Sequence, residues 1–134
     1  MNEYLRRALA CVGTPFQHQG RLLDVGLDCV GLVVQVYQCA EMDRRDYHEV
    51  PTPEHSKFLR QLLDCSFVRE PVDFADSARE GSILAFAFGT RRQIRHLAIR
   101  SGVGMVHAIK RGVVEDVLAE PWLSRFEGAY TWRK

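Results

Sequence analysis

The sequence lacks the features that define several broad classes of protein. No apolar stretch approaches the ~20 residues that a membrane-spanning helix needs, so we expect no membrane span. Lys and Arg number 18 against 17 Asp and Glu, which leaves a formal net charge of +1. Because binding to nucleic acid depends on a surplus of basic residues, this balance argues against a nucleic-acid partner. No Cys-x-x-Cys pair occurs among the four cysteines, so neither a zinc ribbon nor a thioredoxin-type redox site is expected.

The N-terminal residues, Met1 to Arg7, also lack the order of a secretory signal, in which basic residues precede an apolar segment. We therefore expect synthesis in the cytoplasm without a signal peptide, and free thiols rather than disulfides. The five prolines and ten glycines are dispersed, and no repeat or linker-like cluster is visible. The chain of 134 residues is therefore expected to form a single domain over 1–134.

The first half of the chain has the periodicity of helices. Apolar spacing predicts helices over residues 3–11, 29–39 and 53–63, with a loop from 13 to 27. Asp28 stands where the second helix needs an N-cap. The Val-rich segment after it leaves a strand as an alternative, but its length and the Asp at its start favour a helix.

The second half consists of short apolar segments separated by turn residues. These segments predict strands over 83–88, 94–99, 103–109, 113–117 and 129–132. Strands at hairpin spacing form an antiparallel sheet, and helices followed by strands define an α+β fold. We expect the N-terminal helices to pack on this C-terminal antiparallel sheet.

Cys29 differs from the other thiols in its position. It falls in the first turn of the predicted second helix, directly after Asp28. The unpaired N–H groups and the positive end of the helix dipole stabilise a thiolate there, so a lowered pKa and high reactivity are expected. Gly31, two residues on, is costly inside a helix unless another backbone or a substrate lies close to this turn. The alternative is that Cys29 is simply a small core residue.

Two histidines lie on strands that are expected to pair. His96 should share a face with Ile94 and Ala98, and His107 should share one with Met105. Same-face residues near opposite positions of an antiparallel pair come within side-chain reach. If the pair faces the helix that carries Cys29, the three residues supply a nucleophile, a base and an orienting group. The alternative for each histidine is an ordinary half-buried strand residue.

Several short motifs occur in a recognisable order. They are Gly13-Thr14-Pro15-Phe16, Asp28-Cys29-Val30-Gly31-Leu32-Val33, Gly81-Ser82-Ile83, His96-Leu97-Ala98-Ile99 and Met105-Val106-His107-Ala108. Together they resemble the NlpC family of papain-like cell-wall peptidases, over roughly residues 4–132. The amino-acid sequences of 14–21 and 106–115 are similar to those of one branch of this family. That branch is encoded by tailed phages, prophages and gene transfer agents, and its members accompany the tail.

The resemblance implies a papain-like fold and a cysteine hydrolase that cleaves an amide bond in the peptide stem of bacterial peptidoglycan. It implies Cys29 as nucleophile, His96 as base and His107 as third catalytic residue. No metal or organic cofactor is expected. Incorporation into a virion or tail-like particle, with phage-type tail proteins as partners, follows from the same branch.

The resemblance also implies substrate-binding positions, and the chain departs from the family at three of its motif positions. Val30 replaces a Ser that helps to hold the free amino end of the substrate, Phe16 replaces a Tyr, and Ser82 replaces an Asp. Asp28 would bind a substrate amine beside its capping role, and His18 would line the cleft. The first two departures leave open which bond is cut.

Two other functions remain open from the sequence. One is a tail-assembly or structural binding protein with weak or lost hydrolase activity, although the presence of Cys29, His96 and His107 argues against full loss. The other is a zinc site made of the same Cys and two His. Catalytic zinc sets more often take a close pair of histidines from one element, which favours the thiol mechanism.

Overall fold

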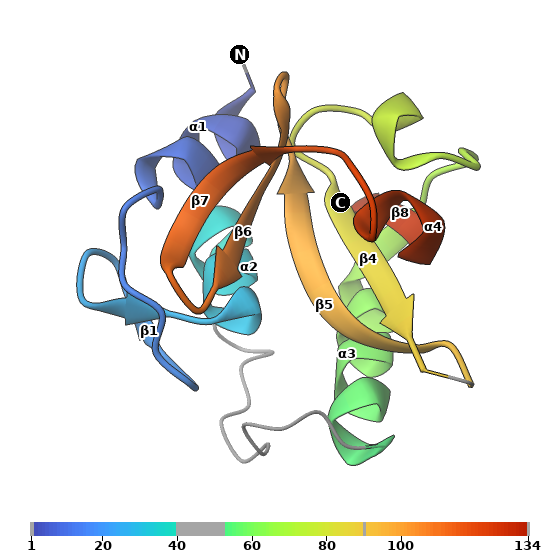
Figure 1. The fold of residues 1–134 in the computed structure, drawn as a ribbon, viewed down its shortest axis with the longest axis horizontal. Helices are drawn as coiled ribbons and strands as arrows, with labels where there is room; N and C mark the ends of the chain where they lie inside the picture. The colour runs from blue at the N-terminus through green and yellow to red at the C-terminus, as the bar shows by residue number, and fades with distance from the viewer. Residues whose placement is uncertain (1, 40–52, 90, 134) are drawn as a thin grey trace.

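The computed structural model describes residues 2–39, 53–89 and 91–133, and these form a mixed α+β structure around a six-stranded antiparallel sheet (Figure 1). The strand order is β3-β8-β4-β5-β6-β7. The strands are β3 (Phe67–Arg69), β4 (Ile83–Phe88), β5 (Gln93–Arg100), β6 (Gly104–Ile109), β7 (Gly112–Val117) and β8 (Phe126–Trp132). The last strand in this series, β8, therefore lies inside the sheet, between β3 and β4.

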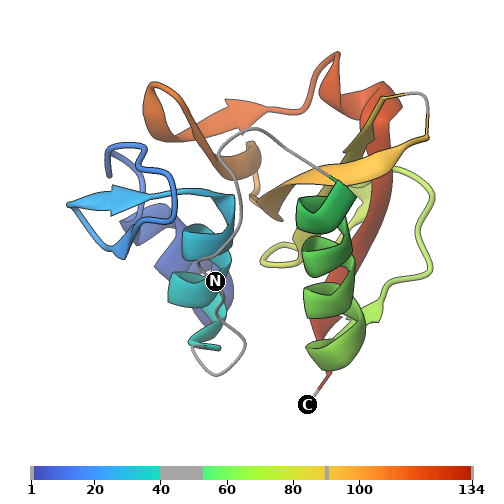
Figure 2. The same ribbon diagram turned by 90° about the horizontal axis from the view of Figure 1, so that it is seen from below.

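Three helices cover one face of the sheet (Figure 2). They are α1 (Glu3–Ala10), α2 (Cys29–Tyr37) and α3 (Pro53–Ser66). The opposite face carries a short 3₁₀ helix, η2 (Ala75–Ser77), and the four-residue helix α4 (Trp122–Arg125). Each face has its own hydrophobic core, and the larger core lies between the sheet and the three helices. In the described part of the chain, no helix combines the length and apolar character needed to cross a membrane.

The helix starts follow from capping residues. The Asn2 side chain accepts a hydrogen bond from Leu5 N at the start of α1, and the Asp28 side chain accepts one from Gly31 N at the start of α2. Gln38 ends α2 in the left-handed conformation, with φ of 53°. Apart from Gln35, α2 has an entirely apolar sequence, which suits a helix buried between α1 and the sheet.

The structure adds short elements that the periodicity did not predict. The expected loop at 13–27 contains a two-stranded hairpin, β1 (Arg21–Leu22) and β2 (Gly26–Leu27). Strand β3, η2 and α4 are also additional, and β8 is longer than the expected 129–132. Each of the unpredicted elements has only two to four residues, too few to establish a period in the sequence.

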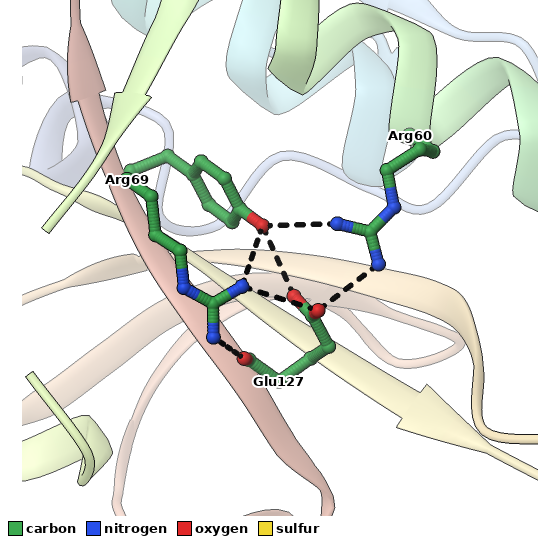
Figure 3. Close-up of polar contacts among 4 residues, drawn as sticks. Arg60, Arg69 and Glu127 are labelled. Carbon is green, nitrogen blue, oxygen red and sulfur yellow. Dashed lines mark hydrogen bonds and ion pairs between the residues drawn. The ribbon is translucent and has the colours of Figure 1, made fainter.

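A charged cluster ties α3 to the strands β3 and β8 (Figure 3). Glu127 Oε2 lies 3.0 Å from Arg60 Nη2 and 3.3 Å from Arg69 Nη1. Tyr130 donates its hydroxyl proton to Glu127 Oε1 at 3.1 Å. Burial acts to raise the pKa of Glu127, but Arg60, followed by Tyr130 and Arg69, holds that pKa below its ordinary value. The carboxylate is therefore the common partner of two guanidinium groups.

Candidate functional site

The site begins where β5 and β6 separate. The two strands pair only at Ile99 with Val106 and at Arg100 with Met105. Beyond these pairs no ladder joins them, and α2 packs against both strands at the opening (Figure 1). The first residue of α2 is Cys29, so the helix presents its N-terminus to a gap in the sheet.

The half-buried Cys29 thiol lies against β5. The backbone N–H groups of Leu97 and Val30 act to lower the pKa of this thiol, which places the sulfur close to both. Leu97 directly follows His96 on β5, so the thiol lies beside β5, next to the position of His96.

A close approach between two backbones sets the start of α2. A Cβ on Gly31 would lie 2.0 Å from the carbonyl oxygen of Gly20. The sequence left open whether another backbone or a substrate required this glycine, and the structure identifies the backbone of Gly20. The loop that precedes β1 is therefore packed directly on the turn that carries Cys29.

Asp28 holds the same loop to the helix. Its two oxygens accept hydrogen bonds from Gly31 N and Gln19 N, both at 2.8 Å, and Arg21 forms an ion pair with it at 3.0 Å. The side chains of both Arg21 and Asp28 are more than nine-tenths buried. This placement makes Asp28 a cap and an anchor, so it does not support the expected binding of a substrate amine.

The environment of the thiol reverses the expected direction of its pKa. Burial raises the pKa of Cys29 to about 12, and the Asp28 carboxylate adds to the increase. The backbone groups of Leu97 and Val30, together with Arg21, act to lower this pKa, but they do not outweigh the loss of water. The expectation of a lowered pKa at this helix terminus is therefore wrong for the resting protein, in which the thiol is neutral.

The two histidines meet, as expected from their neighbouring strands, although β5 and β6 are not paired at these two residues. His96 Nε2 lies 2.9 Å from His107 Nδ1, and the ring centroids are 5.1 Å apart. His107 is 1% exposed, and its Nε2 lies 2.8 Å from Asp116 Oδ2 on β7. Arg111 Nη2 lies 3.5 Å from the other oxygen of Asp116. A continuous chain of polar contacts therefore runs from β5 through β6 to β7.

The face on which the histidine rings lie differs from the expectation. A bulge pairs Phe86 with His96 but Ala87 with Ile94, so Arg95 is the extra residue and Ile94 turns to the opposite face from His96. The His96 ring packs with Phe86 in the core below α4, whereas the next residue, Leu97, packs in the core below α2. The pair thus lies on the far face of the sheet from α2, the helix that begins with Cys29.

Sequence reasoning missed two residues of this site, Asp116 and Trp122. The Trp122 ring stacks on His96 with centroids 4.7 Å apart, and it contacts His107 edge-on at 5.3 Å. For Asp116 a signal existed, because it follows His107 by nine residues across the predicted hairpin of 103–109 with 113–117. For Trp122 no local signal exists, because α4 reaches the histidines only through the fold.

Burial determines the charge state of the two rings. It lowers the pKa of His96 to about 3, with a further contribution from His107. Burial also lowers the pKa of His107, although Asp116 acts in the opposite direction. Both imidazoles are therefore neutral near pH 7. Among the described residues, His96 Nδ1 has no hydrogen bond, whether to Cys29 or to another group.

The remaining expected substrate residues lie at different depths. Val30 has no exposed area and packs in the core under α2, so its placement does not support contact with a substrate. Phe16 is half-buried and forms a β-bridge with Leu27, two residues before Cys29. His18 is half-buried in the same loop. Phe16 and His18 therefore remain near the N-terminus of α2, while Val30 belongs to the interior.

Across residues 2–39, 53–89 and 91–133, no group of three or more His, Cys, Asp or Glu side chains is placed to hold a metal ion. No protein-family model matches the chain, and a search of curated proteins finds no match.

Proposed function

We propose that the chain is a papain-like cysteine hydrolase that cleaves an amide bond in the peptide stem of peptidoglycan, in association with a phage-type tail. The observation that carries this proposal is the hydrogen-bonded pair of His96 and His107, with the Cys29 thiol close to Leu97, the residue that follows His96. A nucleophile, a base and an orienting group are the set that cysteine hydrolysis requires.

The resting charges decide how the proposed reaction begins. With a neutral thiol and a neutral imidazole, His96 removes the thiol proton as the sulfur attacks the substrate carbonyl, so no ion pair forms beforehand. The backbone N–H of Cys29 at the N-terminus of α2 would face the oxyanion. His96 then gives the proton to the leaving amine, and a water molecule activated by the same ring hydrolyses the thioester.

The test is hydrolysis of purified peptidoglycan and of soluble stem-peptide fragments, with products identified by mass spectrometry. We expect the wild-type protein and the Cys65→Ala variant to release the same new amine ends, because Cys65 is exposed and lies on α3. Cys29→Ala and His96→Ala should release none, while circular dichroism shows that they are folded. If the wild type releases no more than Cys29→Ala, the hydrolase proposal is wrong.

One observation favours the alternative of a binding protein with weak or lost activity. Burial raises the pKa of Cys29 to about 12, and the described residues include no hydrogen bond between its thiol and His96. A protein that only binds the cell wall would sediment with intact peptidoglycan without releasing fragments. Under this alternative, wild type and Cys29→Ala sediment equally and neither changes the polymer.

A further inference from the structure

The contacts from β5 to β7 form a chain of hydrogen bonds. In this chain the direction of each hydrogen bond determines the direction of the next one. Asp116 Oδ2 is a carboxylate oxygen and can only accept, so the proton in its contact with His107 must be on His107 Nε2. A neutral imidazole carries one proton, so His107 Nδ1 is then a bare acceptor. The proton in the next contact must consequently be on His96 Nε2, which leaves His96 Nδ1 without one.

These contacts allow only one arrangement of protons because both rings are neutral. An imidazolium donates from both nitrogens, so a charged ring would allow other arrangements. Burial lowers the pKa of both histidines, and only His107 has a carboxylate in contact with it among the described residues. Each ring near pH 7 therefore holds one proton, and its position is set by the neighbouring ring or carboxylate.

The fold fixes the carboxylate at the end of this chain. Met105 pairs with Asp116 and His107 with Val114, so Asp116 and His107 share one face of the hairpin formed by β6 and β7. A Cβ on Gly104 would lie 2.2 Å from the backbone oxygen of Asp116, so this glycine permits the close approach of β7. The Arg111 guanidinium lies near the Asp116 oxygen that does not face His107.

We propose that Asp116 is a positioning residue that sets the tautomers of His107 and His96, so that the bare nitrogen is His96 Nδ1, the one ring nitrogen left to accept the thiol proton. The tautomer assignment stands on the contacts and on the neutral state of both rings, whereas its effect on turnover rests on the proposed hydrolase function. Asp116 acts through two rings and need not touch the substrate.

The experiment is ¹⁵N NMR of the two imidazoles in the folded protein at pH 7. In the wild type we expect a pyridine-like signal for His96 Nδ1 and a protonated signal for its Nε2. In Asp116→Asn, Arg111 can only donate, so the amide oxygen turns to Arg111 and the NH₂ group faces His107. The tautomers should then reverse along the chain, with a proton on His96 Nδ1. The control is Glu115→Gln on the opposite face of β7, which should leave both signals unchanged.

Hydrolysis of stem peptides is measured on the same proteins. We expect Asp116→Asn to lower kcat/KM by on the order of 100-fold, because the base presents the wrong tautomer, and Glu115→Gln to retain the wild-type value. A proton on His96 Nδ1 in the wild type, or unchanged signals in Asp116→Asn, would overturn the inference. If the tautomers reverse as expected but the wild type shows no hydrolysis, the inference stands and the proposed function fails.

Discussion

At the scale of single residues, Cys29 is subject to two opposing effects. The N-terminus of α2 supplies N–H groups that favour a thiolate. Asp28 caps this helix and so places Cys29 at its first residue. Burial under the hairpin loop and beside β5 disfavours the charge more strongly, and the pKa rises to about 12. The cap is visible in the sequence, whereas the burial depends on contacts between distant segments, so only the first effect was predictable.

The raised pKa of Cys29 predicts how its rate of alkylation depends on pH. In the folded protein, the rate of Cys29 labelling by iodoacetamide should keep rising from pH 7 to beyond pH 10, because the thiolate fraction is still increasing. In urea-unfolded protein, the same residue should level off near the ordinary thiol pKa of ~8.5. Mass spectrometry of the labelled peptides measures both rates.

The raised pKa of Cys29 also predicts which of two thiols, Cys29 or Cys65, reacts first. At pH 7 the exposed Cys65 should now be labelled before the half-buried Cys29, which reverses the expectation from helix position alone. A folded-state rate for Cys29 that levels off below pH 8 would show instead that the helix terminus dominates. Circular dichroism at each pH serves as the control for unfolding.

At the scale of elements, α4 acts as a cover for the histidines. Its first residue, Trp122, stacks on His96, and the two rings lie within 30° of parallel. This cover contributes to the burial that lowers the pKa of His96 to about 3. We therefore predict that Trp122→Ala raises the pKa of His96 towards the ordinary ~6.5, as followed by NMR titration. Trp132→Phe is the control, because Trp132 stacks on Tyr37 and not on His96.

The linked effect on stability has a definite sign. A histidine whose pKa is lowered by folding stabilises the protein fully above ~6.5, and this contribution is lost as the pH falls towards 3. The free energy of unfolding should therefore decrease below pH 6.5, by at most about 1.4 kcal/mol per pH unit for this group. The decrease should be shallower in Trp122→Ala. An unchanged His96 titration in that variant would show that other groups keep water away.

The helices and long strands were predictable because their signals are local. Caps at Asn2 and Asp28 and glycine-bounded apolar segments determine them within a few residues. The contact between His96 and His107 was predictable because they lie on neighbouring strands. The face of the sheet on which their rings lie was not predictable. A single extra residue, Arg95, turns Ile94 away from His96, and nothing in the sequence near it distinguishes a bulge from regular strand.

At the scale of the whole molecule, the cluster in Figure 3 joins parts of the chain that are far apart in sequence. Arg60 and Glu127 are separated by 67 residues, and Arg69 and Glu127 by 58. Contacts of this kind have no local signature, so neither the cluster nor the pairing of β3 with β8 was predictable from periodicity. They arise because β8 is placed between β3 and β4.

The cluster predicts a loss of stability in Glu127→Gln. Removal of the negative charge leaves Arg60 and Arg69 facing a neutral amide, and the free energy of unfolding should fall by about 1–3 kcal/mol. Urea denaturation measures the change. In the double variant Arg69→Gln with Glu127→Gln, the loss should be smaller than the sum of the single losses. Losses that simply add would mean that the two side chains are not coupled.

The position of β8 also has a consequence for how the chain can assemble during synthesis. On the ribosome β3 and β4 emerge long before β8, the strand that lies between them and pairs with both. Until residues 126–132 have left the ribosome, both strands keep an unpaired edge, and such edges attract other chains. The four antiparallel strands β4 to β7 can pair early, but β3 joins this sheet only when β8 takes its place between β3 and β4.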